Sequence, residues 1–105
     1  MSTSCTIKIE GITFAKIYKH WDGDPDSTLL WLETFNVDFA TNRGIDPEYK
    51  FAQLLRSSTR DADMFSLDDS KHTGWGVLPY TALVDIDYEY LLSNNGKVTY
   101  KEINE

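Results

Sequence analysis

Alternating apolar and polar residues near both ends of the chain constrain its fold more than any other feature. Residues 5–10 alternate with the period of a half-buried strand. Gly11 ends this segment, and residues 13–20, which are rich in β-forming side chains, follow it. The pattern predicts a first hairpin that turns at Gly11 and Ile12.

The clearest strand signal covers residues 82–92. One side carries the apolar residues Ala82, Val84, Ile86, Tyr88 and Tyr90, and the other carries Asp85, Asp87 and Glu89. Residues 97–103 are the predicted partner strand. We expect a three-residue loop that pairs Tyr90 with Tyr100 and Glu89 with Lys101, with Gly96 in a left-handed bulge position.

Two aspartate and proline pairs between these hairpins are helix-start signals. Asp24 can cap a helix that starts at the next residue and carries apolar side chains at spacings of three and four as far as Phe39. Gly44 can adopt the left-handed backbone conformation that ends this helix. Asp46 begins a second helix, which ends near residues 57–59, and the stretch up to residue 79 predicts a long loop with a turn or two of helix.

The order β-β-α-α-β-β predicts an α+β fold, namely a four-stranded, mostly antiparallel sheet with two helices on one face. A length of 105 residues suits one domain, residues 1–105, and a hydrophobic fraction of 41% suits a folded core that includes the single cysteine, Cys5. No apolar run is long enough to span a bilayer, and the N-terminus lacks a signal-peptide pattern. We therefore expect a soluble, cytoplasmic protein.

The charge balance is strongly acidic, with 17 Asp and Glu residues against 10 Lys and Arg residues and a formal net charge of −7. Direct binding of nucleic acid is not expected, because phosphate contacts need clustered Lys and Arg, which are scattered here among acids. This charge favours a basic surface on a partner protein. Net negative charge also keeps many domains soluble without any partner, and that interpretation stays open.

The polar side of residues 82–92 is the predicted partner-binding face. The carboxylates of Asp85, Asp87 and Glu89 would lie about 7 Å apart along a strand, near the spacing of successive phosphates, and would compete for Lys and Arg clusters. The other predicted partner-binding residues lie in the long loop and are Asp61, Asp63, Asp68, Asp69 and Trp75. Trp75, between two glycines, either packs onto the domain or contacts the partner as an aromatic anchor.

The segment His20-Trp21-Asp22-Gly23 has three interpretations. In the structural one, Asp22 and Gly23 form the turn before the first helix, Trp21 covers the edge of the core, and His20 hydrogen-bonds a loop carbonyl. In the metal interpretation Asp22 starts a calcium-loop pattern, but Ser27 replaces its glycine and a strand precedes it, so no metal or other cofactor is predicted. In the catalytic one His20 is a general base oriented by Asp22. No nucleophile elbow, phosphate-binding loop or zinc spacing accompanies it, and no catalytic residue is assigned.

Two short motifs carry a resemblance: Met-Ser-Thr-Ser-Cys at residues 1–5 and Tyr-Lys-His-Trp-Asp-Gly-Asp-Pro at residues 18–25. They resemble a family of small proteins from phages, prophages and archaeal mobile elements with a Met-Ser-Thr-x-Cys strand and a Tyr-x-His-Trp-Asp-Gly-x-Pro segment. The match covers roughly the first third of the chain. The resemblance implies an accessory protein encoded by a virus or mobile element, and it implies no particular chemical activity.

Two functions of different classes follow. The first is a small acidic accessory protein that binds a basic surface of a host protein and makes no direct contact with nucleic acid or membrane. Its most concrete form is an inhibitor of a nucleic-acid-dependent host defence system, such as a CRISPR effector. The alternative is a protein or enzyme that binds a small ligand or nucleotide derivative at His20, Trp21 and Asp22, in a preformed cleft.

Overall fold

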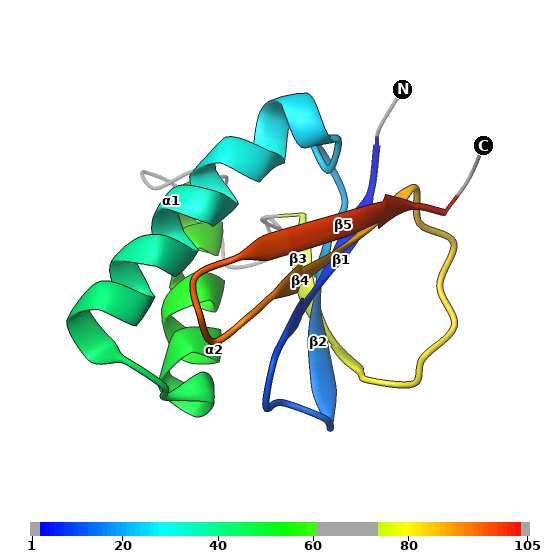
Figure 1. Cartoon of the computed structure of the whole chain (residues 1–105). Helices are drawn as coiled ribbons and strands as arrows, with labels where there is room; N and C mark the ends of the chain where they lie inside the picture. Colours follow the sequence, from blue (N-terminus) through cyan, green and yellow to red (C-terminus); the bar gives the residue numbers. More distant parts are fainter. Residues whose placement is uncertain (1–2, 61–73, 104–105) are drawn as a thin grey trace.

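The chain folds into a five-stranded mixed sheet with both helices on one face, as the computed structural model in Figure 1 shows. The structure describes residues 3–60 and 74–103. Its elements are β1 (Cys5–Ile9), β2 (Ala15–Lys19), α1 (Pro25–Arg43), α2 (Pro47–Arg56), the 3₁₀ helix η1 (Ser57–Arg60), β3 (Trp75–Pro79), β4 (Tyr88–Leu92) and β5 (Val98–Glu102). The strands lie in the order β3-β2-β1-β4-β5. The α+β class is confirmed, but the sheet has five strands instead of the predicted four.

The predicted N-terminal hairpin is confirmed. β1 and β2 pair antiparallel, with Cys5 opposite Lys19 and Ile7 opposite Ile17. The link covers residues 10–14 and is longer than the predicted turn at Gly11 and Ile12. Within it Ile12 folds inward, and only 2% of its surface is exposed. The Ile12 N–H donates to the Ile9 carbonyl at 3.0 Å. The turn therefore adds a side chain to the core.

Both helices begin at the predicted aspartate caps. The Asp24 carboxylate accepts a hydrogen bond from the Ser27 backbone N–H at 3.2 Å, and the Asp46 carboxylate accepts one from the Tyr49 N–H at 3.4 Å. α1 runs one turn beyond its predicted end and stops at Gly44, which has a φ of 68°. Among the helices of the described residues, none is long and apolar enough to cross a membrane.

The C-terminal hairpin has the predicted register. β4 and β5 pair antiparallel, with Glu89 opposite Lys101 and Tyr90 opposite Tyr100. Gly96 closes the three-residue loop with a φ of 93°, a left-handed conformation that suits glycine.

Residues 75–79 form a strand where a loop was predicted. β3 pairs antiparallel with β2 along its whole length, and Pro79 lies opposite Ala15. The prediction was wrong because two glycines and a proline mask the strand pattern. Among the strands that the structure describes, β3 lies at the edge of the sheet, a position where proline is tolerated. Residues 61–73 of the predicted loop lie outside the described residues.

Residues 82–87 are not a strand, so the predicted strand is shortened to β4. This segment carries the chain from β3 past β2 and β1 to β4, which pairs in parallel with β1. It passes over the sheet face opposite the helices (yellow in Figure 1), where Lys16 Nζ donates to the Ala82 carbonyl at 2.7 Å. Ile86 is buried and Leu83 is 99% exposed, so side chains still alternate. The alternation indicates which side chains face the protein, although the backbone has no strand partner.

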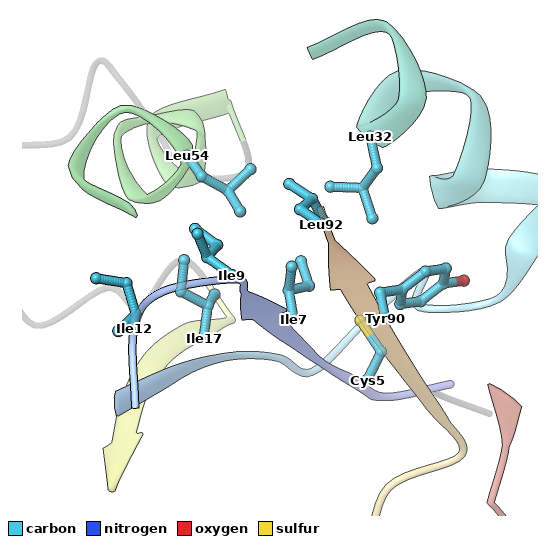
Figure 2. Packing of buried hydrophobic residues seen from close by; sticks show 9 residues of the cluster. All are labelled: Cys5, Ile7, Ile9, Ile12, Ile17, Leu32, Leu54, Tyr90 and Leu92. Atoms are coloured by element: carbon cyan, nitrogen blue, oxygen red, sulfur yellow. The ribbon is translucent and has the colours of Figure 1, made fainter. Parts of the chain in front are cut away.

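The hydrophobic core lies between the sheet and the two helices (Figure 2). Leu32 of α1 and Leu54 of α2 point onto side chains of β1, β2 and β4, and both leucines are fully buried. The cluster consists of Cys5, Ile7, Ile9, Ile12, Ile17, Leu32, Leu54, Tyr90 and Leu92. Cys5 is a core side chain as predicted, and burial raises the pKa of its thiol to about 12. It therefore stays protonated and unreactive near neutral pH.

Candidate functional site

The turn of residues 20–23 joins β2 to α1, and its backbone is tied to the core. Three successive carbonyls accept hydrogen bonds from buried side chains, namely Trp21 from Lys19 Nζ, Asp22 from Thr28 Oγ1, and Gly23 from Tyr90 Oη at 2.7 Å. The donors come from β2, α1 and β4. Buried polar groups need partners, and this turn supplies three of them.

Gly23 lies where the turn meets the chain that enters β1. A Cβ at this position would lie 2.8 Å from the carbonyl carbon of Ser4 and 2.9 Å from the Cβ of Cys5. The Gly23 N–H donates to the Thr3 carbonyl at 2.8 Å. Asp22 has a φ of 56°, a left-handed conformation that aspartate adopts more readily than most residues. The structural interpretation of the turn therefore explains both residues.

The His20 side chain pairs with a tyrosine, and not with the loop carbonyl of the structural interpretation or the carboxylate of the catalytic one. Tyr18 Oη lies 2.8 Å from His20 Nδ1, and the His20 ring meets the Trp21 ring edge-on at a centroid distance of 5.1 Å. Trp21 is 40% exposed and covers Gly74, where a Cβ would clash with the indole. In the described part of the chain, no three His, Cys, Asp or Glu side chains come together as metal ligands. The segment brings together a Tyr–His pair and an indole.

The predicted acidic row does not lie along one strand. Asp85 and Asp87 precede β4, and only Glu89 lies within it. The Asp87 carboxylate accepts a hydrogen bond from the Ser4 N–H at 3.0 Å, and the Asp87 N–H donates to the Ser4 carbonyl at 3.0 Å. Asp87 thus fastens the chain before β4 to the chain before β1. The prediction that all three carboxylates lie on one strand is therefore wrong.

Glu89 lies between two lysines on the sheet face opposite the helices. Its carboxylate is 3.5 Å from Lys8 Nζ and 3.7 Å from Lys101 Nζ. Ion pairs this close to the surface contribute little stability, but they offset the charge that a partner would meet. Glu89 therefore attracts a basic partner less than its position in the sequence indicates.

Trp75 packs onto the domain. It opens β3 as a half-buried residue, and its ring centroid lies 6.1 Å from that of Trp31 on α1. The side chain belongs to the partly buried layer around the core. The remaining predicted partner-binding residues, Asp61, Asp63, Asp68 and Asp69, lie outside the described residues.

Three lysines are buried, and the sequence reasoning missed them. Lys16, Lys19 and Lys50 are 6%, 6% and 1% exposed, whereas no described Asp or Glu side chain is buried. Each of these ammonium groups binds uncharged oxygen atoms, such as Asn36 Oδ1 at 2.8 Å from Lys50 Nζ. Desolvation lowers the pKa of Lys50, and the charge of Glu10 opposes this shift. Because these cations are buried, the surface is more acidic than the composition indicates.

The outer face of α1 combines acidic and apolar side chains. Asp26, Leu30, Glu33 and Val37 follow one another at helical spacing, and we call these four residues the α1 outer face. All four are exposed, Leu30 at 76% and Val37 at 51%. A single exposed leucine is ordinary, but two apolar side chains in one row with carboxylates form a surface suited to a partner. The sequence reasoning missed this face because it followed only the core stripe of the helix.

A groove of about 550 Å³ borders the α1 outer face. Asp26 and Leu30 line it together with the aromatic side chains of Trp31 and Phe35. An aromatic wall beside a carboxylate suits the aliphatic stem and the charged head of a lysine or arginine. The groove therefore adds a place where a basic side chain of a partner can insert.

Comparison of the chain with protein-family models, with curated proteins and with solved structures gave no match. Function therefore has to be inferred from the geometry and chemistry of the chain itself.

Proposed function

We propose that the protein is a small acidic binding protein that occupies a basic surface of a host protein through the α1 outer face. The observation that carries this proposal is the exposure of Leu30 and Val37 in one row with Asp26 and Glu33. Burial of the apolar side chains supplies affinity, and the carboxylates select a partner that carries Lys or Arg.

The burial of three lysines supports the same proposal. Their positive charges bind oxygens inside the protein and are not presented to a partner. The remaining surface attracts basic proteins over a distance set by the ionic strength, about 8 Å at physiological salt. Attraction of this kind speeds association and weakens as salt rises.

A nucleic-acid-binding surface is the class of partner that best fits an acidic face. Such surfaces cluster Lys and Arg to contact phosphates, and carboxylates compete for the same groups. The resemblance of residues 1–5 and 18–25 to mobile-element proteins agrees with a host target. In its most concrete form the proposal is an inhibitor of a nucleic-acid-dependent host defence system.

The binding role predicted for Asp85, Asp87 and Glu89 stays a separate prediction. Asp87 and Glu89 already bind groups of the same chain, which makes them weaker candidates than the α1 outer face. Asp85 and Glu89 therefore provide a control, since changing both removes two negative charges from a different surface, one more than Glu33→Gln removes from the α1 outer face.

Capture from a host lysate tests the proposal. The tagged chain is used as bait, and the captured proteins are identified by mass spectrometry and challenged with heparin, a polyanion. We expect a nucleic-acid-binding protein that heparin releases, and we expect Leu30→Ser with Glu33→Gln to reduce its capture at least about tenfold. Both substitutions lie on an exposed surface, so the melting temperature should change little. Equal capture by this variant, or capture that heparin leaves unchanged, would contradict the proposal.

A further inference from the structure

The groove between α1 and α2 differs in chemistry from the rest of the surface. Its volume is about 450 Å³, within the range of about 300–1,000 Å³ that is usual for small-molecule sites. Rings from both helices line it, and so do two arginines. The lining residues used below are Phe35, Phe39, Tyr49, Asp38, Arg43 and Arg56.

Three aromatic rings form a continuous wall of this groove. The ring centroids of Phe35 and Phe39 are 6.1 Å apart, and those of Phe39 and Tyr49 are 5.9 Å apart. Phe39 is 6% exposed and anchors the wall, while Tyr49 is 37% exposed and faces the opening. A wall of this kind stacks well with a planar ring.

Arg43 lies over this wall. Its guanidinium carbon is 4.2 Å from the centre of the Tyr49 ring. A stacked guanidinium keeps its N–H donors in its own plane, where they can bind a carboxylate or phosphate at their edge. In the described part of the chain no carboxylate forms an ion pair with Arg43.

The second arginine is held in place by a chain of hydrogen bonds. Arg56 Nε donates to Gln53 Oε1 at 3.2 Å, and Gln53 Nε2 donates to Tyr49 Oη at 2.5 Å. The side chains that line this end of the groove are thus ordered before any ligand arrives, which lowers the entropy lost on binding. Every arginine side chain that the structure describes lies at this one groove, in a chain whose net charge is −7.

We propose that the groove binds a small molecule that consists of a planar aromatic ring carrying an anionic group, a phosphate or a carboxylate. The ring packs against the exposed part of Tyr49 beside the Arg43 guanidinium, and the anion meets the donors of Arg43. Among the described lining residues Asp38 is the one carboxylate, and it lies with two arginines. The acidic surface around it repels long polyanions, which limits the ligand to a small anion.

Titration of the full-length ¹⁵N-labelled chain tests this proposal by NMR. Four probes are compared: adenosine monophosphate and indole-3-acetate, which carry a ring and an anion, adenosine, which is a ring alone, and inorganic phosphate, an anion alone. We expect at least one ring-bearing anion to bind about tenfold or more tightly than either half alone, with the largest shifts at the amides around Arg43 and Tyr49. The monophosphate and the carboxylate distinguish the two sources of the anion.

One variant tests the role of Arg43 and a second is its control. Arg43→Gln should weaken binding of the preferred probe at least about tenfold, and Lys97→Gln, which removes an exposed cation elsewhere, should leave it unchanged. The proposal is overturned if no ring-bearing anion binds, if phosphate alone binds as well, if Arg43→Gln has no effect, or if the shifts lie around His20 and Trp21 instead. The proposal shares no residue with the α1 outer face, so its failure leaves the proposed function untouched.

Discussion

The substitution Gly23→Ala tests the structural explanation of the His20-Trp21-Asp22-Gly23 segment. The new Cβ would lie 2.8 Å from the carbonyl carbon of Ser4, which is backbone and cannot rotate away. The turn and the chain that enters β1 must therefore move apart. This movement also stretches the hydrogen bond from Tyr90 Oη to the Gly23 carbonyl, which is 2.7 Å long.

Two contributions set the size of the effect. Forced shifts in a well-packed site cost about 1–3 kcal/mol. A buried hydroxyl whose hydrogen bond is broken costs about 1–3 kcal/mol more. We expect the free energy of unfolding to fall by about 3 kcal/mol, which corresponds to a loss of about 12–24 °C in Tm for a domain of this size.

Gly76→Ala is the matched control, because a Cβ on Gly76 meets nothing within 4 Å. We expect this variant to stay within about 0.5 kcal/mol of the parent. Both variants are measured by thermal and urea denaturation, followed by circular dichroism. A Tm for Gly23→Ala equal to that for Gly76→Ala would refute the argument that close backbone approach requires glycine in the turn.

Three further predictions concern the hairpin, the buried lysine and the thiol. Gly96→Ala should cost about 1 kcal/mol in urea denaturation, because its φ of 93° disfavours a Cβ while the nearest side-chain atom is 3.5 Å away; an unchanged midpoint would count against the left-handed loop. Asn36→Leu should lower the free energy of unfolding by about 2–4 kcal/mol, because Lys50 Nζ and two backbone carbonyls lose a partner. Adding Lys50→Met should recover part of that loss, because it removes the unpaired charge. Additive losses in the double variant would contradict this. The raised pKa of the Cys5 thiol means that its contribution to stability is complete below pH 9.0 and is lost as pH rises toward about 12. Cys5→Ala should therefore show a smaller loss of stability than the parent between about pH 8 and about pH 10, and an equal loss would show that the thiol is not the cause.

Local patterns predicted most of the secondary structure because their causes are local. The caps at Asp24 and Asp46 and the left-handed glycines act within a few residues, and the structure confirms them. The parallel pairing of β1 with β4 has no such cause, since the paired residues are about 80 positions apart and only the closed sheet brings them together. The alternation of residues 82–87 was therefore taken for a strand although it belongs to a connection.

The buried lysines show a different limit. Lys19 follows Ala15 and Ile17 at a spacing of two, which places it on the core side of β2, and Lys50 lies four residues before Leu54 on α2. This spacing is visible in the sequence, but the free-energy cost of burying a charge favours placing both lysines on the surface. Only the structure shows the oxygen atoms that offset this cost.

The candidate surfaces could be predicted only in part. The acidity of the chain was evident from its composition, and it still favours a basic partner. The α1 outer face depends on which side chains the packing of the core leaves exposed. The groove that Arg43 and Arg56 line depends on how α1 packs against α2. Both are properties of packing, which no local pattern encodes.

The affinity of the captured partner, measured across a salt series, tests the central claim most directly. Three chains are compared: the parent, Leu30→Ser with Glu33→Gln on the α1 outer face, and the control Asp85→Asn with Glu89→Gln. The proposed function predicts that parent affinity falls steeply with salt, that the α1 variant binds at least about tenfold more weakly at every salt concentration, and that the control loses no more than about twofold. Parent-like binding by the α1 variant, together with loss of binding by the control, would contradict the claim and place the partner on the β4 side of the molecule.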